Sequence, residues 1–214
     1  MPAMNNLVAG IRVPDTRLIQ EATEIAREAS EPFLFHHVMR SYYFGELFGQ
    51  VVGLSYDREL LYVSAVLHDL GLTERFAGPL RFEVDGANAA RAFLAERGVP
   101  KEKMALVWDA IALHTSLGIA EHKEPEVAIT HIGISMDYGG FALDKLPKEA
   151  VAEVLRAYPR LEMKTKLQHA LCRVVERKPH TSFGNFLTDF GRRYVPDFQE
   201  MSPCDALAGA PFDS

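Results

Sequence analysis

The stretch SAVLHDLGLTERF, residues 64–76, places an adjacent histidine and aspartate, His68 and Asp69, at the end of an apolar run with helical spacing. The preceding residues, 60–67, are apolar on nearly every face, which is typical of a helix in the centre of a fold. A charged carboxylate buried there without a partner costs several kcal/mol. The sequence therefore predicts a buried group that neutralises Asp69.

Composition limits the classes of function. The chain has 214 residues, 48% of them hydrophobic, and a formal net charge of −6 at pH 7. Nonspecific binding to nucleic acids or membrane surfaces needs a basic face, so we expect neither partner. No apolar run is long enough to cross a membrane and no signal peptide is visible, so we expect a cytoplasmic protein. The two cysteines do not form a disulfide framework, and a homo-oligomer is left open.

Helical periodicity and helix-terminating residues recur along the chain, whereas alternating strand patterns are scarce. Asp15, Asp57 and the prolines at 32, 100 and 125 mark helix starts, and several glycines mark ends. The pattern predicts an all-α, compact single-domain helical bundle over residues 15–200. Residues 1–14 are interpreted as an N-terminal arm and 201–214 as a loose C-terminal tail. Helices are predicted over 16–29, 33–52, 57–71, 83–97, 100–114, 125–140, 148–157, 161–177 and 182–193.

Two other apolar helices also carry buried polar groups. FLFHHVMRSYYFGELF, residues 33–48, contains His37 and Arg40 three residues apart on one face, and PEVAITHIGISMDYGG ends near Asp137. For His68 and Asp69 taken alone, a satisfied core histidine and a helix-capping aspartate explain the pair about as well as a metal does. When the three helices are considered together, one divalent ion bound by His37, His68, Asp69 and Asp137 would pair with the buried polar side chains of all three. This donor set suits one first-row metal, with Zn²⁺ preferred and Fe²⁺ or Mn²⁺ as alternatives.

The ordered set of a histidine, a later His-Asp pair and a distant aspartate resembles the HD-domain superfamily of metal-dependent hydrolases. Within it, the segments HHVMRSYYFGELFG, LHDLGLT, RFEVDGANAARAFL, IALHTSLG and ISMDYGG are most similar to the cyanamide hydratase-like branch. The resemblance implies one metal, usually zinc, on the four ligands above. It also implies that His114 stands beside the substrate and that Glu83 belongs to the site. Ser116 replaces an aspartate of that branch, and the loop 73–81 differs in length and character.

The predicted chemistry is attack by metal-activated water on a small nitrile-, cyanamide- or amide-like substrate. Asp69, His114 and Glu83 are the predicted catalytic residues, although a helix-end histidine and a first-turn glutamate also occur for structural reasons. Arg40 is expected to form an ion pair with Asp69 or Asp137 on the side away from the metal. The alternative is that Arg40 binds the substrate. Phe76, in the loop 73–81, is expected to line the pocket. The alternatives are a phosphohydrolase acting on nucleotides or other phosphate esters, and a binding module without catalysis.

Overall fold

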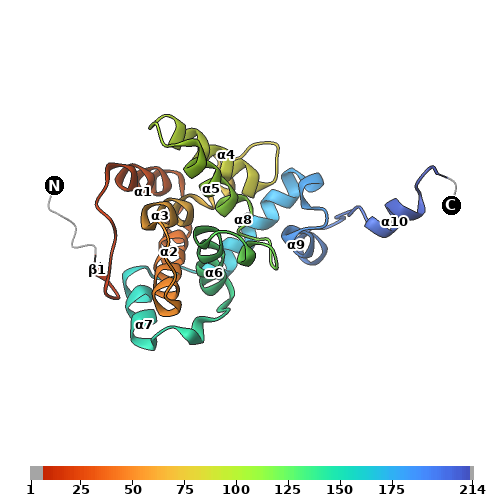
Figure 1. The fold of residues 1–214 in the computed structure, drawn as a ribbon. Coiled ribbons are helices and arrows are strands. Elements are labelled where there is room, and N and C mark those ends of the chain that lie inside the picture. Colours follow the sequence, from red (N-terminus) through yellow and green to blue (C-terminus); the bar gives the residue numbers. More distant parts are fainter. Residues whose placement is uncertain (1–6, 213–214) are drawn as a thin grey trace.

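Helices form nearly all of the secondary structure in the computed structural model, which describes residues 7–212 (Figure 1). The predicted all-α class is confirmed. Among the described residues, the only sheet is a hairpin of two strands with two residues each. The α-helices are α1 (Arg17–Ala29), α2 (Pro32–Val52), α3 (Arg58–Leu67), α4 (Phe82–Ala95), α5 (Lys101–Ala112), α6 (Pro125–Gly139), α7 (Lys148–Ala157), α8 (Met163–Arg177), α9 (Phe186–Tyr194) and α10 (Pro203–Ala208). The strands are β1 (Leu7–Val8) and β2 (Ile11–Arg12), and the 3₁₀ turns are η1 (Leu70–Leu72), η2 (Ala120–His122), η3 (Leu143–Lys145) and η4 (Pro179–Ser182).

The helix pair α2 and α6 forms the centre of the molecule, and the two helices run antiparallel. Glycines let them approach closely, because a Cβ atom on Gly133 would overlap the backbone of Ser41 and Gly45. One turn from this contact, α2 carries His37 and α6 carries Asp137. The close crossing therefore brings together two polar residues that are 100 positions apart in the sequence.

The helix α3 delivers the His-Asp pair to this centre. As predicted, Asp57 caps its start, and the carboxylate accepts hydrogen bonds from the backbone N–H groups of Glu59 and Leu60 at 3.0 and 3.2 Å. The helix ends at Leu67 and not at Gly71, and η1 follows after Asp69. Gly71 has a packing role there, since a Cβ atom would overlap the backbone of Phe82 at the start of α4.

The C-terminal helices α8 and α9 pack against each other and build a second apolar cluster beside the central core. In Figure 1 these helices lie on the opposite side of the α2–α6 pair from α1. Their apolar faces contact the start of α2 and the start of α4, through Phe33, Leu34 and Phe82. A hollow next to the end of α3 is closed by this second cluster.

The chain ends differ in detail from the sequence expectations. Thr16, and not Asp15, caps α1, and its hydroxyl accepts from the Ile19 N–H at 3.2 Å. The described part of the N-terminal arm forms the β1–β2 hairpin, whereas residues 1–6 lie outside the described residues. The C-terminal tail contains the exposed helix α10, which projects from the body in Figure 1, and residues 213–214 are not described. Within residues 7–212, no helix has the length and hydropathy needed to cross a membrane.

Candidate metal centre

Three histidines converge on the carboxylate of Asp69. The Nε2 atoms of His37 and His68 lie 3.6 and 3.2 Å from Asp69 Oδ2, and Nε2 of His114 lies 3.8 Å from Oδ1. All four side chains are buried. One ligand atom each from His37, His68 and Asp69 falls within a group no wider than 4.8 Å. The cluster thus joins residues from α2, from the end of α3 and, through His114, from the segment just after α5.

The outer nitrogen of each ring is held by an acceptor. Nδ1 of His68 bonds the carbonyl oxygen of Ala65 at 2.7 Å, and Nδ1 of His114 bonds that of Ile111 at 2.6 Å. Nδ1 of His37 bonds Asp137 at 2.6 Å. Because Nδ1 must donate in these bonds, the neutral rings each carry a lone pair on Nε2 that points toward Asp69. This is the tautomer that a metal ligand needs.

One buried atom in the cluster is left without a hydrogen bond. Within the described part of the chain, His68 Nε2 has no hydrogen-bond partner, although the nearest Asp69 oxygen is 3.2 Å away. Buried polar atoms are usually satisfied, so an orphan in such a place points to a missing ligand. Two imidazole nitrogens and one carboxylate fit a first-row divalent ion and leave further positions for water or substrate. The residues present therefore fit the metal that the sequence predicts.

The electrostatics of the cluster favour a bound cation. Burial alone would raise the pKa of Asp69, but His68, His37 and His114 together outweigh burial and hold the pKa well below its ordinary value. Burial would lower the pKa of His68, and the Asp69 carboxylate raises it instead. Burial and the positive charge at His68 lower the pKa of His114 to about 4. A metal ion would replace the proton on His68 as the partner of Asp69.

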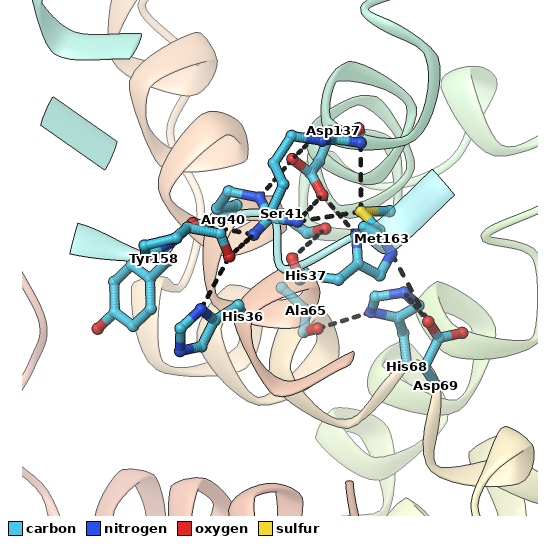
Figure 2. A network of polar contacts seen from close by, with 12 residues as sticks. His36, His37, Arg40, Ser41, Ala65, His68, Asp69, Asp137, Tyr158 and Met163 are labelled. Atoms are coloured by element: carbon cyan, nitrogen blue, oxygen red, sulfur yellow. Dashed lines mark hydrogen bonds and ion pairs between the residues drawn. The ribbon is translucent and has the colours of Figure 1, made fainter. Parts of the chain in front are cut away.

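Asp137 lies beside this group, which consists of His37, His68 and Asp69 in this structure, and its role as a metal ligand stays a prediction. Its Oδ1 accepts from Arg40 Nε at 2.7 Å and from Arg160 Nη1 at 3.0 Å, and its Oδ2 accepts from His37 Nδ1 and Arg40 Nη2 at 2.6 and 2.9 Å (Figure 2). These four hydrogen bonds use the four lone-pair sites of the carboxylate. Burial would raise its pKa, but His37 and Arg40 lower it to about 2. Asp137 orients His37 in this structure.

Arg40 lies where the sequence analysis favoured it, behind the cluster and fully buried. Besides its two bonds to Asp137, its guanidinium donates to the carbonyl oxygens of Tyr158 and Pro159 at 2.9 and 3.1 Å (Figure 2). The neighbouring His36 points away from the cluster, and its Nδ1 bonds the carbonyl oxygen of Pro159 at 2.9 Å. Arg40 therefore fixes Asp137, which in turn fixes the ring of His37.

Glu83 is buried but lies outside the cavity. Its carboxylate accepts from Arg81 Nη2 and from the Thr115 hydroxyl, both at 2.7 Å. Burial would raise the pKa of Glu83, but Arg81, His114 and Thr115 together outweigh burial and lower the pKa. The structure thus places Glu83 behind the segment that carries His114, and its predicted catalytic role stays a prediction.

A cavity of about 170 Å³ opens beside the metal cluster. Phe76 and the rest of the loop 73–81 are not among the residues that line it in this structure, and the predicted role of Phe76 in substrate binding stays a prediction. The loop is held away by Lys178, whose ammonium donates to the carbonyl oxygens of Gly78 and Leu80 and pairs with Asp85 at 2.6 Å. The cavity is lined by His37, His68, Asp69, Leu72, Phe82, His114, Thr115, Leu117, His131, Ile134, Ser135, Tyr138, Phe141, Leu167, Leu171 and Phe186.

Sequence analysis missed two parts of this lining. His131 is buried, and its Nδ1 bonds the carbonyl oxygen of His114 at 2.7 Å, while Nε2 lies 3.3 Å from Glu121. The sequence did carry a signal for His131, because it is a histidine within an apolar helix about two turns before Asp137. The apolar wall from α8 and α9, including Leu167 and Phe186, has ordinary helical spacing and gives no such signal.

The comparison with protein families gives a match. A family model described as "HD domain" matches residues 34–196, which is most of the chain, and the match spans the three histidines, Asp69 and Asp137. A comparison with curated protein sequences gives no match. The matched length shows the family and its coarse chemistry, so the chain belongs to the HD domain family of metal-dependent hydrolases.

Proposed function

We propose that this protein is a metal-dependent hydratase or hydrolase that acts on a small nitrile-, cyanamide- or amide-like group. The observation that carries the proposal is the composition of the cavity beside the metal cluster. Its described lining contains no lysine or arginine, and most of its members are apolar or aromatic. A phosphate ester in that cavity would keep much of its charge uncompensated, whereas a neutral carbon–nitrogen group would not.

His37, His68 and Asp69 would hold the ion, with Zn²⁺ preferred and Fe²⁺ or Mn²⁺ as alternatives. When bound, a divalent ion there lowers the pKa of a coordinated water and polarises a substrate atom next to it. The protein supplies the orientation of the ligands through Asp137 and the carbonyl of Ala65. Its apolar wall excludes bulk water from the reacting group.

His114 is the proton carrier in this proposal. It lines the cavity, and its pKa of about 4 keeps the ring neutral at physiological pH. The bond from Nδ1 to Ile111 leaves Nε2 free to accept a proton from the attacking water and to return it to the substrate nitrogen. His131 holds the carbonyl of His114 and so fixes the position of the ring.

A substrate panel tests the proposal. The metal-loaded protein is assayed against small nitriles, cyanamide and amides, and in parallel against nucleotides and simple phosphate esters. We expect turnover in the first group and a loss of about 10²–10⁴-fold in His114→Ala, with the metal retained. The matched control is His122→Ala, which removes an exposed histidine nearby. Phosphate release without action on any nitrile, cyanamide or amide would replace the proposal with a phosphohydrolase.

A further inference from the structure

The apolar cavity shares a wall with a second hollow on the surface. This outer groove has a volume of about 440 Å³ and lies between the end of α6, α8 and α9. Four residues line both spaces: Tyr138, Leu167, Leu171 and Phe186. The rings of Tyr138 and Phe186 meet edge to face, with centroids 5.5 Å apart. An aromatic pair thus stands at the boundary between the two spaces.

The two spaces differ in charge. The described lining of the inner cavity has no basic side chain apart from its histidines, whereas the groove is lined by Arg160, Lys164 and Arg193. Asp189 is the only acidic residue among the described groove residues. It pairs with Arg193 at 3.0 Å, but both side chains are 65% exposed, so solvent weakens this pair. The groove therefore carries a surplus of positive charge.

Arg160 and Lys164 supply most of that surplus. Arg160 donates to the backbone and side-chain oxygens of Asp137, both at 3.0 Å, but this carboxylate already receives two bonds from the buried Arg40. Two guanidinium groups thus share one carboxylate, and Arg160 is still 35% exposed. In the described residues, Lys164 forms no ion pair and is exposed. Both charges are available to an anion in the groove.

We propose that the groove binds the anionic end of the substrate, so that the substrate is an amphipathic molecule. Its carboxylate or phosphate group would lie among the three cations of the groove, Arg160, Lys164 and Arg193. Its apolar middle would cross the Tyr138–Phe186 pair, and its neutral reacting group would enter the inner cavity. The location of the reacting group rests on the proposed function, whereas the anion site in the groove does not.

Binding of unreactive probes tests the groove alone. The probes are 4-phenylbutyrate, 4-phenylbutyl phosphate and the neutral 4-phenyl-1-butanol, titrated into the metal-loaded protein by calorimetry. We expect at least one of the two anions to bind about tenfold more tightly than the alcohol at low salt, with the preference reduced in 0.5 M NaCl. The stronger of the two anions identifies the headgroup.

Charge reversal shows where the anion binds. The double variant Lys164→Glu/Arg193→Glu should lose the preference, because both changed side chains are exposed groove residues with no bond to the metal cluster. Lys166→Glu is the control, since it lies on the same helix outside the groove. A preference that survives the double variant would indicate an anion at the metal centre and overturn the inference, as would equal affinity for all three probes. Failure of the substrate panel with this preference intact would overturn the proposed function only.

Discussion

The two sides of the cavity come from different kinds of sequence. The metal side is built by polar residues inserted into the apolar helices α2, α3 and α6 and at the end of α5. The opposite wall is built by ordinary apolar faces of α8 and α9 that also belong to the second hydrophobic cluster. Binding of the ion therefore depends on a few side chains whose burial is costly unless they are paired. Substrate shape depends on packing between helices that are distant in the sequence.

The largest effect should come from breaking the metal side. We expect His37→Ala to lower the metal content from about one equivalent to near zero and to destabilise the fold, because buried carboxylates lose their partners. Elemental analysis and urea unfolding measure both effects. The neighbouring His36→Ala is a matched control, since His36 bonds only the backbone of Pro159 and should keep the metal. A wild-type protein that stays metal-free and equally stable with a chelator would contradict the metal centre.

A smaller effect is expected from Asp137→Asn. The amide cannot accept all four bonds that the carboxylate takes, and Arg40 stays buried without its full counter-charge. We expect a loss of about 3–5 kcal/mol in the free energy of unfolding, as for other broken buried ion pairs. Metal affinity should fall by about 10–100-fold because His37 loses its orientation.

Metal competition titrations distinguish this role from direct ligation. If Asp137 were itself a ligand, the metal content would fall as far as in His37→Ala. Asp144→Asn, at an exposed aspartate in η3, is the control and should change neither quantity.

These two sides also explain what the sequence could and could not predict. The pattern of His68, Asp69 and His37 was readable because buried polar groups stand out in apolar helices. The hydrogen bonds of Asp137 to His37 and Arg40 were not readable, because the sequence places Asp137 near the site but does not say which nitrogen of His37 faces it. Gly71 was interpreted as a helix end, although its role is contact with Phe82 of α4. Such roles depend on packing that sequence spacing does not encode.

The position of the loop 73–81, which was expected to line the pocket, also depends on packing. The loop 73–81 was adjacent in sequence to the His-Asp pair, so it was a natural choice for the pocket. Lys178, 93 residues beyond Asp85, ties this loop back through a buried ion pair and two carbonyl oxygens. That contact leaves the space open to α8 and α9. Some helix boundaries were easier, and the predicted helix over 148–157 matches α7 because helical periodicity is a local signal.

Changing the wall should leave the metal side intact. Phe186→Ala removes an aromatic ring that lines the cavity, and the ring is only partly buried. We expect KM for an accepted substrate to rise on the order of tenfold, with metal content unchanged and kcat within a few-fold. Steady-state kinetics with elemental analysis measure this split. Phe183→Ala is the control, since Phe183 packs on Phe198 and does not line the cavity. Equal effects in both variants would remove the wall from substrate binding.

The smallest effect should come from an aspartate on α3 that lies far from both sides of the cavity. Asp57 caps the helix, and its carboxylate also accepts a hydrogen bond from Lys103 at 2.7 Å. Asp57→Ala should cost about 1 kcal/mol of unfolding free energy, which is typical of a lost helix cap. Metal content should not change, which would show that the helix start and the site at its end are independent.

The pH dependence of that cost identifies the charge of Asp57. Partial burial would raise its pKa, but Lys103 and the backbone N–H groups of Leu60 and Glu59 together outweigh this and lower it in the folded protein. A depressed carboxylate pKa stabilises the fold above the unfolded value, about 3.9, and the benefit is lost as the pH falls through the lower folded value. The difference in stability between wild type and Asp57→Ala should therefore be constant near neutral pH and shrink below about pH 4. Asp57→Asn keeps the cap but not the charge, so its stability relative to Asp57→Ala should stay the same across this range, and urea unfolding at each pH would reveal any departure.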